Sequence, residues 1–102
     1  MTKAEVVSDI KDRIAREGGL EYEIENTEIT AIIDAFFETV KDAVTKGESI
    51  ELRGFGTFKH KVRAAKVARN PRTNQPVNMQ KHAIPYFKPG IQFKDMLKNL
   101  KV

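Results

Sequence analysis

Seven lysines and arginines lie within residues 59–81, KHKVRAAKVARNPRTNQPVNMQK, and this segment contains no acidic residue. Cations at this density favour a polyanionic partner, because each can neutralise a phosphate or another anionic group. The apolar residues of the segment are small or widely spaced, so they cannot build a core. Turn formers gather at residues 70–74, where Pro71 presets φ and Asn74 tolerates the left-handed region. The pattern predicts a long, two-stranded basic hairpin, here called the arm (residues 59–81).

Catalytic and metal-binding chemistry has only weak candidates in this chain. His60 and His82 are the two histidines, and both lie at the base of the arm among cations. Asp9 and Asp12 share one predicted helix but belong to no recognisable catalytic motif. The absence of cysteine excludes disulfides, thiolate metal sites and cysteine nucleophiles. We therefore expect no catalytic residue, no metal site, no cofactor and no small-molecule substrate.

Charge is distributed unevenly along the 102 residues. Between Glu51 and Asp95 there are ten Lys or Arg residues and no acid, so this part carries a charge of +10. The rest of the chain has eight basic and fourteen acidic residues, which gives −6 and leaves the net charge of +4. Such asymmetry indicates one strongly positive surface. Nucleic acid is the leading partner that this surface predicts, and an anionic membrane is the second.

The composition is that of one folded domain, with 40% hydrophobic and 31% charged residues. The first residues, MTKAEVVSDI, lack the apolar region of a secretory signal. The longest apolar cluster, AIIDAFF, is too short to span a bilayer. We expect a cytoplasmic protein.

A first helix is predicted from the N-terminus. Thr2 and Glu5 have the spacing of a capping box, and the glycine pair 18–19 ends the helix. Residues 20–26 alternate glutamates with apolar residues, which predicts an extended linker with one apolar side. Asn26 or Thr27 is then the expected cap of a second helix.

The second helix should end at Gly47. A strand is predicted at residues 49–53, and Gly54-Phe55-Gly56 turns the chain into the arm. These glycines do not form a phosphate-binding loop, because Lys59 stands where the G-x-G-x-x-G pattern needs its third glycine. Residues 82–87 return as a strand, and Pro85 favours a sheet edge or a strand end. A short C-terminal helix is expected within residues 90–102.

The helical part carries more apolar surface than it can bury alone. Without the arm, roughly 80 residues remain, and a domain of this size buries its own core only marginally. The apolar residues of the second helix also cover more of its circumference than one sheet can face. We therefore expect a dimer with one shared core. Its predicted core residues are Phe36, Phe37, Val40, Phe55, Phe58 and Phe87.

Three motifs resemble one protein family. GFGTF at residues 54–58, RAAKVARNPRT at 63–73 and PYFKPG at 85–90 resemble the bacterial HU/IHF family of DNA-bending proteins. The resemblance covers essentially the whole chain. It implies an α+β fold, in which two intertwined subunits form a helical body with a small antiparallel sheet and one long β-hairpin arm per subunit. The single domain, 1–102, would comprise a helical dimerisation part (1–47), a sheet with the arm (48–89) and the C-terminal helix (90–102).

The resemblance also implies a mode of DNA binding. The arms would enter the minor groove, and a proline at each tip, Pro71 by position, would wedge between base pairs. Cations on the arm and the body would contact phosphates. The residues expected to bind DNA are Lys3, Arg53, Lys59, Lys61, Arg63, Lys66, Arg69, Asn70, Pro71, Arg72, Thr73, Asn74, Lys81, Lys88 and Lys94.

The function implied is that of a histone-like, nucleoid-associated protein that bends duplex DNA with little sequence specificity and helps to compact the bacterial chromosome. Bent, nicked or flexible duplexes would be preferred. The alternative is an IHF-like subunit of a site-preferring heterodimer that acts in recombination and transcription control. IELRGFGTF and PYFKPG look nearer to the IHF side of the family. The second subunit is accordingly an identical copy or a paralogue.

Other partners are less favoured by the residues of the arm. The arm lacks the apolar face of an interfacial membrane helix and the aromatic residues that stack on RNA bases. The chain also departs from the family pattern in three places. Asn74 stands where glycine is usual, Lys66 replaces the common arginine, and the linker at residues 21–25 is longer than usual.

Overall fold

The computed structural model describes residues 1–102 and contains three helices and five strands. In chain order these are α1 (Lys3–Glu17), α2 (Asn26–Thr45), β1 (Ile50–Leu52), β2 (Gly56–Arg63), β3 (Lys66–Arg69), β4 (Pro76–Met79), β5 (His82–Pro89) and α3 (Ile91–Asp95). The predicted α+β class is confirmed. The chain divides into two compact units, Met1–Thr39 and Val40–Val102, and α2 contributes to both. None of the helices is long and apolar enough to cross a membrane.

Helix α1 begins and ends where the sequence predicts. The backbone N–H of Glu5 donates to Thr2 Oγ1 at 3.3 Å, so Thr2 is the N-cap. Gly18 follows the last turn with φ of 64°, and its N–H donates to the carbonyl of Ile14. Glycine adopts this left-handed conformation at little cost, which stops the helix at this point.

Helix α2 begins one residue earlier than a cap at Asn26 predicts, and two residues earlier than a cap at Thr27 predicts. The carbonyl of Glu25 accepts a hydrogen bond from the N–H of Ile29, so Glu25 occupies the cap position in place of Asn26 or Thr27. The carboxylate of Glu28 accepts from the N–H of Glu25 at 3.0 Å. This reciprocal bond is one half of a capping box, and it lets a glutamate stand where Asn or Thr would ordinarily be preferred.

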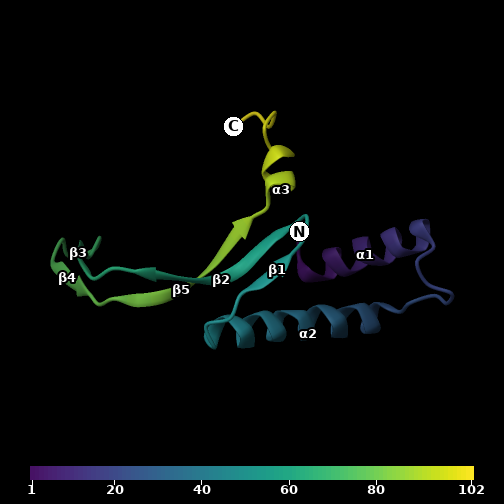
Figure 1. The fold of residues 1–102 in the computed structure, drawn as a ribbon, viewed down its shortest axis with the longest axis horizontal. Coiled ribbons are helices and arrows are strands. Elements are labelled where there is room, and N and C mark those ends of the chain that lie inside the picture. The colour runs from purple at the N-terminus through teal and green to yellow at the C-terminus, as the bar shows by residue number, and fades with distance from the viewer. The chain divides into compact units, whose positions relative to one another are not determined.

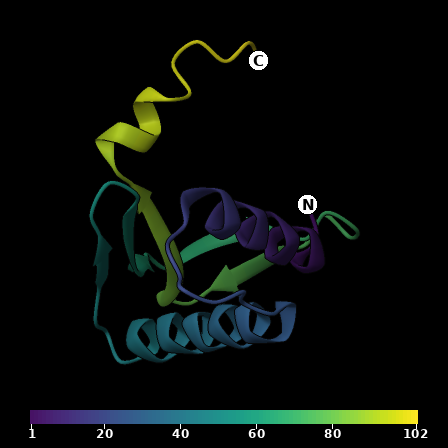
Figure 2. The same ribbon diagram turned by 90° about the vertical axis from the view of Figure 1, so that its right-hand side faces the viewer.

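The buried core of the first unit is small. Val7, Ile24 and Ile29 are its buried members, with exposed fractions of 4%, 6% and 2%, and they are the only buried apolar side chains in the chain. These three side chains form one cluster, with Val7 on α1, Ile29 on α2 and Ile24 in the linker between the helices. Figure 2 shows the two helices side by side and the linker that joins them. Farther along α2, Ile32 and Phe37 are exposed. The apolar stripe of α2 therefore extends well beyond what its own chain covers.

The second unit contains a three-stranded antiparallel sheet in the order β1-β2-β5. Strand β5 is an edge strand, as Pro85 predicts, because an edge strand can tolerate a residue without an N–H. Gly56 enters β2 with φ of 158° and lies against β5. A Cβ at this position would come within 2.5 Å of the Lys88 carbonyl oxygen and 2.6 Å of the Phe87 ring, so only glycine fits.

Four phenylalanines cluster beside this sheet: Phe55, Phe58, Phe87 and Phe93. The shortest distance between ring centroids is 4.8 Å, for Phe58 and Phe87, and Phe93 of α3 stacks on Phe55 at 5.4 Å. Helix α3 is shorter than expected within residues 90–102, since turns follow it at residues 96–99. Ile91 and Met96 are about four-fifths exposed, at 78% and 80%, so this end has little of its own chain to pack on.

The arm is part of a hairpin made of two paired segments (Figure 1). In the first segment, residues 59–63 of the arm pair with residues 82–86 of β5, so the hairpin extends beyond the predicted range of 59–81. The pairing of β2 with β5 ends at Arg63 and His82, and that of β3 with β4 begins at Lys66 and Met79. Residues 64–65 and 80–81 between the two segments belong to no strand. The hairpin predicted from the sequence is present, with an interruption that the sequence pattern does not reveal.

Candidate nucleic-acid interface

The part of the arm nearest the sheet has one cationic face. Residues directly opposite each other in an antiparallel pair point to the same side, and side chains alternate along each strand. Thr57 pairs with Lys88, and every second pair after it brings another cation to the same side. We call this the cationic face. Its cations are Lys59, Lys61, Arg63 and Lys88, and Ile84, Tyr86 and the neutral His82 lie on the same side.

The opposite side of the same two strands is mostly apolar, with His60 as its one polar side chain. The alternate pairs join Phe58 with Phe87, His60 with Pro85 and Val62 with Ala83. We call this the apolar face, made of Phe58, Val62, Ala83, Pro85 and Phe87. A ribbon with one cationic and one apolar face can contact a polyanion on one side and a hydrophobic surface on the other.

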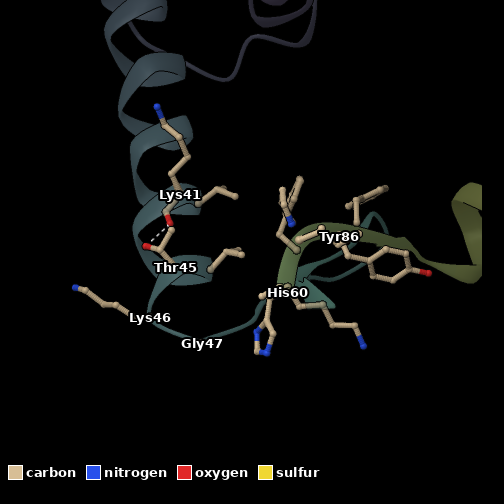
Figure 3. A pocket seen from close by; sticks show the side chains of 14 residues that line it. Lys41, Thr45, Lys46, Gly47, His60 and Tyr86 are labelled. Atoms are coloured by element: carbon tan, nitrogen blue, oxygen red, sulfur yellow. Dashed lines mark hydrogen bonds between the residues drawn. The ribbon is translucent and has the colours of Figure 1, made fainter. Parts of the chain in front are cut away.

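A cavity of about 990 Å³ opens between the end of α2 and strands β2 and β5. Figure 3 shows Lys41, Thr45 and Lys46 on the helical side, with His60 and Tyr86 on the strands across from them. Much of its lining is apolar: Val40, Val44, Phe58, Ala83, Ile84, Pro85, Tyr86 and Phe87. No three His, Cys, Asp or Glu residues in the chain lie close enough together to hold a metal ion. The cavity is therefore suited to apolar groups rather than to a metal.

The cations of the arm have no acidic partners. The ion pairs of the protein join residues outside the arm, such as Lys11 with Glu23 and Lys98 with Asp95. Lys61 Nζ lies 4.8 Å from the centroid of the Tyr86 ring, within the range of a cation–π contact. The positive charges of the arm thus remain available to phosphates.

The tip of the arm is ordered by its own hydrogen bonds. The N–H of Asn70 donates to the carbonyl of Gln75 at 2.9 Å, and the N–H of Asn74 donates to the carbonyl of Asn70 at 2.7 Å. Asn70 Oδ1 accepts from the N–H of Arg72 at 2.9 Å. Asn74 has a φ of 57°, which asparagine tolerates better than most residues with a side chain. Pro71 lies exposed within this turn.

The remaining predicted DNA-binding residues are spread over several elements. Lys66 and Arg69 lie on β3, and Lys81 lies in the interruption of the arm. Arg53 lies in the turn between β1 and β2, and Lys94 lies on α3, and both are exposed. The structure thus brings most of the predicted set onto the arm and its base, within the second unit.

Lys3 lies in the first unit, where it already has a partner. Its Nζ donates to Asp34 Oδ1 at 2.8 Å, and both side chains are about half exposed. Sequence reasoning missed Asp34, because the two residues are 31 positions apart and nothing in the helical pattern links them. An exposed pair of this kind contributes about 0–1 kcal/mol to stability, so a phosphate can compete for Lys3.

We predict that Asp34→Asn strengthens DNA binding at low salt. The substitution frees Lys3 and removes a negative charge, so the slope of log affinity against log salt should steepen by about one unit if Lys3 neutralises one more phosphate. Fluorescence titrations of a duplex at several salt concentrations measure this slope. Asp9→Asn is the matched control, because Asp9 holds Arg13 at 2.7 Å and that bond raises the pKa of Arg13, which is outside the predicted interface. Equal slopes of log affinity against log salt for the two variants would show that Lys3 does not contact DNA.

The sequence of the whole chain identifies its family. A family model described as bacterial DNA-binding protein matches residues 1–98. The chain belongs to this family. The family's proteins bind DNA as structural proteins and are not enzymes, in agreement with the prediction for this chain. Family membership also supports double-stranded DNA and a second subunit as partners.

Individual relatives point to the HU branch of the family. The chain is 34% identical over 98 residues to DNA-binding protein HU of Thermotoga maritima, covering 96% of this chain and 100% of that one. It is 35% identical over 95 residues to DNA-binding protein HU of Clostridium pasteurianum, covering 93% and 96%. These names support the histone-like prediction over the IHF-like alternative.

Solved structures agree with the family assignment. The fold is similar to that of HU in an Anabaena HU–DNA cocrystal structure, with a TM-score of 0.80 and 27% identity over 97% of this chain and 99% of that chain. HU of Thermotoga maritima also matches, with a TM-score of 0.57 and 26% identity over 96% of this chain and 100% of that chain. The HU-like α+β fold predicted from the motifs is confirmed.

Proposed function

We propose that this protein is a histone-like, nucleoid-associated protein that binds duplex DNA in the minor groove, bends it and helps to compact the bacterial chromosome. The observation that carries this proposal is the acid-free arm, with a cationic face at its base and Pro71 in an ordered turn at its tip. The minor groove distinguishes little beyond A·T from G·C, so sequence specificity should be low. Site preference would then come from DNA deformability. Its place in the cell would be the cytoplasm, on the nucleoid.

Pro71 is proposed as the wedge. Proline is rigid and apolar, and it lacks an N–H that would need a partner between bases. Unstacking a base step costs about a few kcal/mol for minor-groove wedging proteins, HU and IHF among them, and the bent DNA offsets this by contacting more protein surface. A nick or gap lowers the unstacking cost, so such DNA should be preferred.

The working form is proposed to be a dimer, with an identical copy as the second subunit. Only three apolar side chains are buried within the single chain, whereas Phe36 and Phe37 of α2 are 39% and 48% exposed. The apolar face and the cavity beside it offer further hydrophobic surface. We assign the shared core to Phe36, Phe37, Val40, Phe55, Phe58 and Phe87. Two-fold symmetry would supply two arms to one duplex.

We predict that Val40→Asp disrupts this dimer. Val40 lines the cavity, and a carboxylate there would have to be buried against the apolar surface of the partner. Sedimentation at micromolar concentration should show a dimer for the parent and dissociated or unfolded chains for the variant. Thr39→Asp places the same charge on the preceding, exposed residue and should leave the dimer intact. A parent protein that sediments as a stable folded monomer would refute the dimer.

A comparison of three anionic binding partners tests the proposed function directly. We expect duplex DNA to bind more tightly than double-stranded RNA of matched length or vesicles of anionic lipid. The reason is that the arm is suited to the B-form minor groove and has neither an RNA-stacking aromatic residue nor an interfacial helix. Titrations of the three in one buffer decide the matter. Equal affinity for all three would show that the arm binds any polyanion through its charge alone, and it would contradict the proposed preference for duplex DNA.

A further inference from the structure

Arg69 differs from the other cations of the arm because it is bonded to the tip. Its Nη1 donates to the carbonyl oxygen of Asn74 at 3.0 Å, across the turn that contains Pro71. Arg69 is the last residue of β3, and Asn74 is the residue with φ of 57°. The bond therefore joins the end of a strand to the one turn residue with a left-handed backbone conformation.

The last backbone pair of the turn, Asn70 with Gln75, has only one of its two possible hydrogen bonds. Asn70 donates to the carbonyl of Gln75, but the return bond is absent, since the N–H of Gln75 points to Thr73 Oγ1 at 3.3 Å. The carbonyl of Asn70 accepts from Asn74 instead. The guanidinium of Arg69 adds a third hydrogen bond across the turn, from a side chain, next to the residue pair in which one backbone bond is missing.

We propose that Arg69 is a positioning residue that holds the Pro71 tip in its wedging shape before DNA arrives. This rests on the proposed wedge and adds the side chain that presents it. A guanidinium has five N–H donors, so one bond to Asn74 leaves the others for a phosphate. A tip that is already ordered loses less conformational entropy on insertion than a mobile one.

Lys66 provides the matched control. It lies on the same strand, three residues before Arg69, is exposed like Arg69 and carries the same charge. Its side chain makes no hydrogen bond or ion pair. Arg69→Met and Lys66→Met therefore remove the same charge from one strand, but only the first removes a bond to the tip. Both residues lie outside the buried core, so both variants should fold and dimerise.

The first test needs no DNA. Amide ¹⁵N relaxation of the free protein reports the order of Arg72 and Asn74, with order parameters of about 0.85 for a rigid backbone and below about 0.6 for a flexible one. We expect both values to fall in Arg69→Met and to stay at the parent level in Lys66→Met. Motion of the whole arm affects the two variants alike, so the comparison isolates the tip. Unchanged order in Arg69→Met would overturn the proposal.

The second test compares a nicked with an intact duplex. Both variants should bind both duplexes more weakly than the parent, because each has one cation fewer. Only Arg69→Met should also show a smaller preference for the nicked duplex, by about threefold to tenfold, the factor that one net hydrogen bond contributes. If the two variants keep the same ratio, Arg69 acts as a phosphate contact alone.

The two tests separate this proposal from the wedge on which it rests. If Pro71→Ala leaves bending unchanged, the wedge fails, and the relaxation measurement still decides whether Arg69 orders the tip. If Pro71→Ala abolishes the preference for nicked DNA and Arg69→Met does not reduce it, the wedge stands and the positioning role fails.

Discussion

Pro71→Ala should reduce the bend that the protein imposes on duplex DNA and remove most of its preference for nicked over intact duplex. Pro71 lies exposed at the tip of a basic arm, where its ring has no core to pack against. Inserting it into an intact duplex costs unstacking energy of about a few kcal/mol, whereas a nick has already weakened the stack. The preference should therefore fall by roughly tenfold or more. Binding to linear duplex should persist, because every cation of the arm remains.

The measurement combines fluorescence energy transfer between the ends of a short duplex with titrations on nicked and intact DNA. Pro76→Ala is the matched control, since Pro76 is an exposed proline on the same hairpin but begins β4 outside the turn. It should bend DNA like the parent. If Pro71→Ala also bends DNA like the parent, Pro71 is only a turn residue and the wedge is wrong.

The affinity of the parent for duplex DNA should fall by ~10³–10⁵ between 50 and 200 mM salt. This range corresponds to about 6–10 neutralised phosphates per dimer, and the unpaired cations of each arm can supply most of them. Replacing Lys66 with alanine should lower the log–log slope by about one unit for each phosphate that is no longer neutralised.

Titrations of one duplex at four or more salt concentrations give the slope. Glu48→Gln serves as a control, because Glu48 is an exposed acid that precedes β1 and lies outside the arm. Its slope should stay within error of that of the parent. A nearly flat plot for the parent would show that phosphate neutralisation is not the main source of affinity.

The local features of the fold could be predicted because their causes are local. Thr2, Glu5 and Gly18 set the ends of α1 through bonds to their own backbone neighbours. The arm could be recognised because its composition excludes a core and its turn formers lie together at residues 70–74. Pro85 favoured a sheet edge or a strand end, and β5 is an edge strand.

Features that depend on a second partner could not be predicted in the same way. Glu25 takes the cap position of α2, where its N–H donates to the carboxylate of Glu28. The regular part of α3 stops at Asp95, although apolar residues continue to Leu100, and these residues are exposed in the single chain. The periodic pattern marks a face to be buried, but it does not show how far the chain stays helical without a surface to pack on.

The roles of individual cations in the DNA-binding site could not be predicted from the sequence either. From the sequence alone, Lys3, Lys66 and Arg69 have the same predicted role, that of a cation that contacts phosphate. The structure distinguishes them, because Lys3 is paired with Asp34, Arg69 is bonded to Asn74 and Lys66 is unpaired. Charge counting can locate the interface along the chain, but the role of each cation depends on the acceptor that folding brings near it.

The central claim is that the arms bend the duplex to which they bind. Energy transfer between dyes at the two ends of a short duplex, followed as parent protein is added, tests it most directly. The proposed function predicts that transfer rises with occupancy and reaches a plateau at one dimer per duplex. Saturated binding with no change in transfer would contradict it and would leave the protein a DNA-binding protein that does not bend DNA.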